Sequence, residues 1–206
     1  EATGNPIAIE ELNEDELRRL VLCNLARLVV KGEWTGLLES GGGAETLGDL
    51  TDVLLDQTNF VDSILIQTNS DGSAPTTGTL NNADNNVGIG KDVLQAVTSG
   101  NDNVAIGQNC AKATDTGDEG VYIGRDAGAA GSHSNVVYIG RNAGKAGGGN
   151  NSVHIGSKAG ADATGGHTNV TLGKESGETM TGSYNVGVGA ISLSDGSYSG
   201  NGGIGL

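Results

Sequence analysis

The side chains best suited to acid–base chemistry or metal binding are three histidines, His133, His154 and His167. Imidazole titrates near neutral pH and is a common metal ligand. The three histidines fall at different places within the sequence repeat described below, so stacking of the repeats does not gather them. The chain also has no Gly-x-Ser-x-Gly nucleophile elbow and no Gly-Lys-Ser/Thr phosphate loop. The sequence therefore predicts no enzyme, no metal site and no cofactor.

The acidic and polar residues raise two other possibilities, a Ca²⁺ site and an ice-binding face. The acidic run 115–119 is the best place for an incidental Ca²⁺ ion, but calcium-binding β-rolls repeat a nine-residue Gly-Gly-x-Gly-x-Asp unit. Here carboxylates do not recur at one position of the repeat. An ice-binding face would need an outward array of threonines, and the corresponding positions hold Tyr122, Tyr138, His154 and Thr171. Both sites are disfavoured.

One motif, Asn-Val-x-Ile-Gly, recurs from Asn86 to the last residues of the chain. Its closing glycines lie at positions 90, 107, 124, 140, 156, 173, 189 and 205, so the period is 16 or 17 residues. A strand of three to five residues cannot cover its own apolar side, so the copies must stack. Gly- and Asn-rich turns join them, because both residues accept left-handed backbone angles. The sequence predicts a mainly β fold, a parallel β-solenoid or β-roll of about eight repeats.

Alternation within each strand predicts two faces. Val and Ile of each Val-x-Ile segment share one face, which is apolar in nearly every copy, and the residue between them points the other way. We expect the constant face to be the core: Val104, Ile106, Val121, Ile123, Val137, Ile139, Val153 and Ile155. The varied column then points outward. Its Tyr122, Tyr138 and His154 are a candidate surface strip for a glycan or receptor, or else a contact between chains or a cover for the strand face.

The residues that follow each glycine also recur. Lys91, Gln108, Arg125, Arg141 and Lys174 come first, and Asp92, Asn109, Asp126, Asn142 and Glu175 come next. These two columns are expected to neutralise each other between coils or chains. A small pair such as Ala127-Gly128 follows and indicates a close approach to the far side of the coil or to a neighbouring chain.

Composition excludes several classes of function. The chain has 206 residues, with 25 acidic and 11 basic side chains and a net charge of −14, so binding to nucleic-acid phosphates is not expected. No apolar run reaches the length of a membrane span. Two cysteines, Cys23 and Cys110, make no disulfide framework.

The N-terminal part has a different character. Asn13 is placed to cap a helix over residues 13–31, with Glu16 completing a capping box. Its apolar side chains are too numerous for a lone helix, so it packs on copies of itself, on a partner, or against its own domain. Residues 1–40 are interpreted as an attachment segment, 41–85 as a linker with a short β element, and 86–206 as a solenoid shaft that continues further. The attachment helix would use Leu17, Leu20, Val21, Leu25 and Leu28.

The repeats resemble a known class of proteins. Segments 103–107 (Asn-Val-Ala-Ile-Gly) and 181–185 (Thr-Gly-Ser-Tyr-Asn) are similar to the Gly-rich repeats of tailed-bacteriophage fibre proteins. Segment 47–53 (Leu-Gly-Asp-Leu-Thr-Asp-Val) also looks like a segment common in phage fibres and appendages. The repeats are similar, too, to the heads of trimeric autotransporter adhesins, whose repeats are usually shorter. Both resemblances imply a homotrimer.

The resemblance implies a structural virion protein: the N-terminal part of a trimeric phage fibre. It would dock on a capsid, collar or tail protein through the N-terminal segment and carry a host-binding tip for a glycan or receptor. No nucleic acid or membrane is expected as a partner. The alternatives are the head of a bacterial trimeric surface adhesin and a capsid-decorating fibre. The sequence leaves open whether each chain forms its own solenoid or three chains intertwine.

Overall fold

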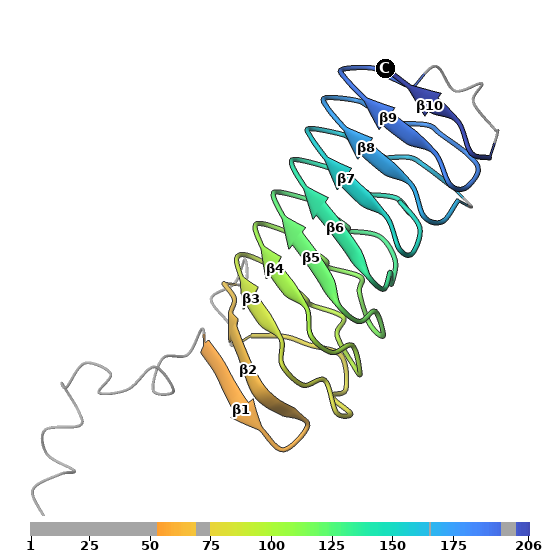
Figure 1. Cartoon of the computed structure of the whole chain (residues 1–206). Coiled ribbons are helices and arrows are strands. Elements are labelled where there is room, and N and C mark those ends of the chain that lie inside the picture. Colours follow the sequence, from red (N-terminus) through yellow and green to blue (C-terminus); the bar gives the residue numbers. More distant parts are fainter. Residues whose placement is uncertain (1–52, 69–74, 165, 195–200) are drawn as a thin grey trace, which may run out of the picture. The chain divides into compact units, whose positions relative to one another are not determined.

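The computed structural model describes residues 53–68, 75–164, 166–194 and 201–206. The chain divides into two compact units, 1–45 and 46–206, and the described residues all belong to the second. They form one sheet of ten strands whose order in space follows their order in the chain (Figure 1). The strands are β1 (Val53–Gln57), β2 (Phe60–Ile66), β3 (Val87–Ile89), β4 (Val104–Ile106), β5 (Gly120–Ile123), β6 (Val136–Ile139), β7 (Val153–Ile155), β8 (Val170–Leu172), β9 (Val186–Val188) and β10 (Ile204–Gly205).

The parallel β-solenoid predicted from the repeats is confirmed, with about seven turns. Strands β2 to β10 are parallel and in register, so Val104 lies opposite Val121 and Ile106 opposite Ile123. Each 16- or 17-residue repeat makes one coil, and a single chain makes the whole stack (Figure 1). β1 turns back and pairs antiparallel with β2. Because β2 pairs in parallel with β3, the sheet already begins within residues 41–85.

Residues 13–31 of the predicted helix, with Leu17, Leu20, Val21, Leu25 and Leu28, lie outside the described residues, as does the whole 1–40 segment. The part of the chain that is described contains no helix.

The predicted faces of the strands are wrong: the two columns are exchanged. The middle residues Tyr122, Tyr138 and His154 are fully buried, whereas Ile106, Ile123 and Ile155 are 37–38% exposed. The remaining predicted core residues are only partly buried: Val104, Val121, Val137, Ile139 and Val153. The varied column is therefore the core, and the constant Val and Ile columns lie on the outside of the solenoid.

The core varies because each coil fills its interior from one of two sides. Where the strand carries a large residue, the turn opposite carries glycine: a Cβ on Gly144 would lie 2.5 Å from the Tyr138 ring. Where the strand carries Gly88, the turn supplies Leu94, which is fully buried. In a narrow interior packed to normal protein density, these two positions share one space, so a large side chain at one excludes a large side chain at the other. A constant column is consequently no guide to the inside of this solenoid.

The glycine that ends each strand is required by the stacking. Gly124 has a φ of 127°, in the region that favours glycine, and a Cβ there would lie 2.6 Å from the carbonyl oxygen of Gly140 in the next coil. The same arrangement recurs along the stack, which explains why this glycine is the most regular feature of the sequence.

Candidate functional surface

The predicted strip of Tyr122, Tyr138 and His154 is a stack of rings inside the solenoid. The centroids of the Tyr122 and Tyr138 rings are 5.6 Å apart in an edge contact, and those of Tyr138 and His154 are 5.0 Å apart and stacked. The rings thus contact each other as neighbours in one column, but none of them reaches the surface. The strip cannot contact a glycan or receptor from this position.

Each buried ring has a hydrogen-bond partner within the chain. The Tyr138 hydroxyl donates to the Gly149 carbonyl oxygen at 2.7 Å. His154 Nε2 lies 2.9 Å from the Gly148 carbonyl oxygen, which can only accept, so Nε2 carries the proton and Nδ1 accepts from Thr171 Oγ1 at 2.7 Å. Burial lowers the pKa of His154 to about 4 and raises the pKa of both tyrosines. All three rings are therefore neutral at pH 7 and pack the core.

The other two histidines differ in how close they lie to this stack. His133 is partly buried, with its ring centroid 6.0 Å from that of Tyr138 and its pKa lowered by burial. His167 is exposed, and its Nδ1 accepts a hydrogen bond from the Asn150 backbone N–H at 3.2 Å. His133 and His154 thus flank the same tyrosine, whereas His167 contacts the Asn150 backbone.

Two columns of polar side chains join successive coils. The first is the buried asparagine of the repeat: Asn103 Nδ2 donates to the Gly117 carbonyl oxygen at 2.7 Å, and its Oδ1 accepts from the Gly120 N–H of the next coil at 2.9 Å. The second lies in the turn before each strand, where Asp118 Oδ1 accepts from the Asn101 N–H at 2.7 Å. The role of these side chains between coils was not predicted from the sequence. The available signal was the asparagine that directly precedes four of the strands, at Asn86, Asn103, Asn169 and Asn185.

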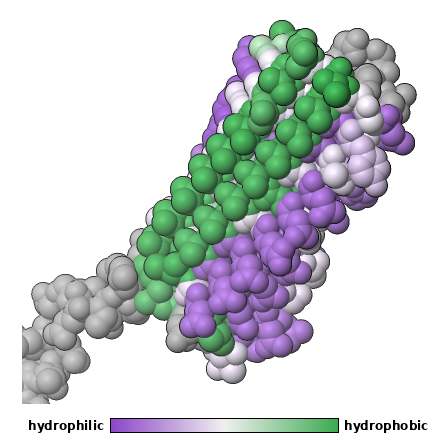
Figure 2. Space-filling model, in the orientation of Figure 1, coloured by the Kyte–Doolittle hydropathy of each residue, from purple (hydrophilic) through white to green (hydrophobic). Residues whose placement is uncertain are grey.

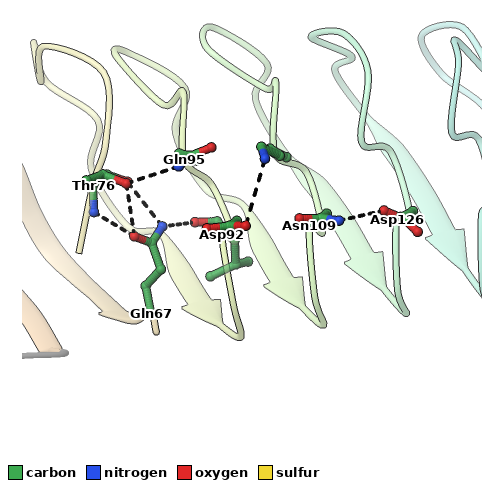
Figure 3. A network of polar contacts seen from close by, with 8 residues as sticks. Gln67, Thr76, Asp92, Gln95, Asn109 and Asp126 are labelled. Atoms are coloured by element: carbon green, nitrogen blue, oxygen red, sulfur yellow. Dashed lines mark hydrogen bonds and ion pairs between the residues drawn. The ribbon is translucent and has the colours of Figure 1, made fainter. Parts of the chain in front are cut away.

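The first coil is closed by a polar network around Gln67 (Figure 3). Gln67 is fully buried, its Nε2 donates to the Val93 carbonyl oxygen at 2.6 Å, and its Oε1 accepts from the Thr76 N–H at 2.6 Å. Further along, Asn109 Nδ2 donates to Asp126 Oδ1 at 2.9 Å. The amide of Gln67 thus has both its ends bonded within the chain, and the network stabilises the start of the stack.

The outer side of the sheet is an apolar stripe. Figure 2 shows two adjacent rows of hydrophobic residues that run along the solenoid. Ile89, Ile106, Ile123, Ile155, Leu172 and Val188 are 36–41% exposed. The outward positions of β3 to β9 carry no charged side chain. We call the outward Val, Ile and Leu side chains of β2 to β9 the outer stripe: Ile64, Ile66, Val87, Ile89, Val104, Ile106, Val121, Ile123, Val137, Ile139, Val153, Ile155, Val170, Leu172, Val186 and Val188.

Charged columns border the outer stripe. On the side where each strand ends lie basic residues, and two of them pair with the acid beside them: Arg125 Nε is 3.7 Å from Asp126, and Lys174 Nζ is 3.5 Å from Glu175. Both pairs join neighbours within one coil, so they do not supply the predicted neutralisation between coils or chains. On the side where the strands begin, Asp102 and Glu119 are exposed acids, and the equivalent positions of the other coils are uncharged. Exposed ion pairs contribute about 0–1 kcal/mol, so these charges orient contacts more than they stabilise the coil.

The described residues offer little reactive chemistry. They contain no group of three or more His, Cys, Asp or Glu side chains placed to hold a metal ion. Cys110 is buried, and burial raises the pKa of its thiol to about 12, so the nucleophilic thiolate is scarce at neutral pH. The Asp115 carboxylate accepts hydrogen bonds from Ser132 and Thr116. Within the same ranges, no helical segment has the length and hydropathy of a membrane span.

Comparison with known proteins returned nothing: no family model, no curated protein and no solved structure matches this chain.

Proposed function

We propose that this chain forms the shaft in the N-terminal part of a trimeric bacteriophage fibre and is a structural protein of the virion, not an enzyme. The observation that supports this role is the unbroken stack from β2 to β10. Every coil pairs with the next in register, and side chains such as Asn103 and Asp118 join neighbouring coils a second time. A stack bonded in this way suits a stiff spacer.

In this role the work of the protein is mechanical. Three chains would associate and hold three host-binding tips at a fixed distance from the particle, while the N-terminal segment docks on a capsid, collar or tail protein. Several weak contacts between the tips and a surface glycan or receptor then combine, because binding of the first tip raises the effective concentration of the others. Neither a nucleic acid nor a membrane takes part. The proposal that the particle is a bacteriophage rests on the resemblance of the repeats to phage fibre repeats.

Immunogold electron microscopy tests this proposal. An antibody raised against the purified protein should label a thin appendage on phage particles from the source strain, at a defined distance from the capsid or tail. Label on the surface of uninfected bacteria would replace the proposal with the adhesin head, and label spread over the capsid lattice would replace it with a decorating fibre. Absence of label from particles would overturn it.

The number of chains is tested separately. Light scattering after size exclusion should give a mass of three times 20.6 kDa for the purified protein. A monomer at micromolar concentration would overturn the trimeric shaft, whatever the antibody labels.

A further inference from the structure

We propose that the outer stripe is the surface through which copies of this chain associate, and that the associated copies run in the same direction. This inference rests on the proposed self-association and adds the face and the orientation. The partner that covers the stripe is thus a second copy of this chain.

The size and composition of the stripe call for a partner. It follows eight strands spaced about 4.8 Å apart and has two columns of side chains about 7 Å apart, so it covers roughly 35 Å by 10 Å. Monomeric proteins rarely expose a continuous apolar patch larger than a few hundred Å² unless it binds something. A standard stable interface buries about 800 Å² on each partner, so the stripe would supply the apolar centre and its borders the polar rim.

The regular spacing of the stripe favours a copy of the same chain. Ile106, Ile123 and Ile139 repeat with the spacing of the strands because the strands are paired in register. A surface that interdigitates with such a row must repeat at the same interval over the same length. A second copy has this property by construction, whereas an unrelated globular protein or a small ligand does not.

The charges on the two borders favour copies that run in the same direction. Glu119 precedes β5 and Arg125 follows it, so the two side chains lie on opposite borders of the same coil. When parallel copies face each other in register, Glu119 of one lies at the height of Arg125 of the other. Antiparallel copies would bring like borders together, so Asp102 and Glu119 would lose the basic border as their partner. Opposite charges across an interface favour one arrangement over another more than they raise affinity.

The first experiment removes the apolar contact. Ile123→Lys with Ile155→Lys changes two stripe residues that are each 37% exposed in the single chain, so the coil itself should form normally. We expect a monomer by light scattering, with the β signal in circular dichroism unchanged. The matched control is Ala113→Lys with Ala130→Lys, two exposed residues in the turns, which should leave the assembly intact.

A second variant guards against misfolding. Ile123→Thr with Ile155→Thr keeps the β-branched shape and should weaken association at least tenfold with the fold retained. If the folded lysine and threonine variants both assemble like the parent protein, the stripe is not the interface, although a trimeric fibre with another interface would survive. A parent protein that is itself monomeric would overturn both proposals.

The second experiment measures orientation. Ala190 is exposed beside the end of β9, and Ala190→Cys in a Cys23→Ser background accepts a spin label there, since the buried Cys110 thiol is protected. Parallel copies should give one short label-to-label distance in a double electron–electron resonance measurement. Antiparallel copies would separate the labels by roughly another 34 Å, seven strand spacings, and would overturn the orientation.

Charge reversal tests the borders themselves. Glu119→Arg and Arg125→Glu should each weaken association several-fold, and the two together should restore it. Loss that is additive in the double variant would overturn the pairing of the borders.

Discussion

The middle and the ends of the solenoid solve the same packing problem from opposite sides. In the middle coils the strand supplies the large side chain, Tyr122, Tyr138 or His154, and the turn opposite is glycine. In β3 and β9 the strand carries Gly88 and Gly187, and the turns carry Leu94 and Leu193. The backbone path is the same throughout, since all strands remain in register. The strand position and the turn position share one space, so a large side chain at either one requires a small residue at the other.

The two solutions differ in chemistry. The aliphatic side chains of the end coils need no hydrogen-bond partner. Each ring in the middle coils needs a partner for its hydroxyl or ring nitrogens, which the turn carbonyls and Thr171 provide. We therefore expect the middle coils to be more sensitive both to loss of volume and to acid.

Loss of volume should have the largest effect. Tyr138→Ala removes a ring that is fully buried, contacts the rings on both sides and donates to Gly149. Comparable truncations in protein cores cost about 3–5 kcal/mol. We expect a loss of unfolding free energy in this range in urea denaturation. The matched control is Tyr184→Ala, because Tyr184 is 66% exposed, and an equal loss there would contradict the assignment of the core.

Acid should weaken the middle coils next. The pKa of His154 is about 4 in the fold against 6.5 when exposed, so its contribution to stability is complete above pH 6.5. Between pH 6.5 and 4, His154 is protonated in the unfolded chain but not in the folded chain. The free energy of unfolding therefore falls by about 3 kcal/mol as the pH drops through this range. Below pH 4 both states are protonated and no more is lost from this group. His133 has a lowered pKa and acts in the same sense.

Hydrogen exchange at several pH values measures this effect and locates it. Amides of β6 to β8 should lose protection between pH 6.5 and 4, while those of β3 and β4 should change less. His154→Tyr copies Tyr138, whose turn is likewise glycine, and should reduce the pH dependence. A pH dependence as steep as that of the parent protein would show that another group is responsible.

These differences explain what the sequence could and could not predict. The period, the parallel stack and the turn positions follow from the spacing of the glycines that end the strands, because backbone stacking requires glycine there in successive coils. The inward column does not, because Tyr138 and Leu94 occupy different positions and yet fill equivalent space. The signal was present in pairs: Ala143-Gly144 accompanies a large strand residue, and Val93-Leu94 accompanies Gly88.

The outer stripe was wrongly predicted to be the core because its residues are constant. Its Val and Ile are constant, which in a monomeric domain is typical of a core, but here they line the exterior of the chain. The candidate strip of rings was placed on the surface by the same exchange. The helix with Leu17 and Leu20, the homotrimer and the virion partner stay predictions.

The pairing of strand and turn can be tested directly by a double-mutant cycle. A Cβ on Gly144 would lie 2.5 Å from the Tyr138 ring, so Gly144→Ala should cost about 1–3 kcal/mol by overpacking, in addition to the backbone strain of alanine at a φ of 54°. Combined with Tyr138→Ala, the same change reproduces the natural pair of Ala105 and Ala111 in β4 and its turn. We expect the double variant to be at least 1 kcal/mol more stable than the sum of the single losses. Strict additivity in urea denaturation would mean that the two positions do not share space.

The smallest expected effect on stability concerns Ile191, in the turn that follows β9. Ile191 has a φ of 64°, a backbone conformation that β-branched residues rarely adopt, and the equivalent position in the middle coils holds Asn142 with a φ of 60°. Ile191 is 61% exposed, and its N–H donates to the Lys174 carbonyl oxygen at 2.8 Å, a bond that asparagine can keep. Ile191→Asn should therefore stabilise the end of the stack by about 0.5–1 kcal/mol through relief of local strain. The reciprocal Asn142→Ile should destabilise the middle by a similar amount.

Because each change alters one coil only, hydrogen exchange should report slower opening near β9 in the first variant and faster opening near β6 in the second. If Ile191→Asn instead destabilises β9, then the isoleucine makes an apolar contact that outweighs its backbone strain.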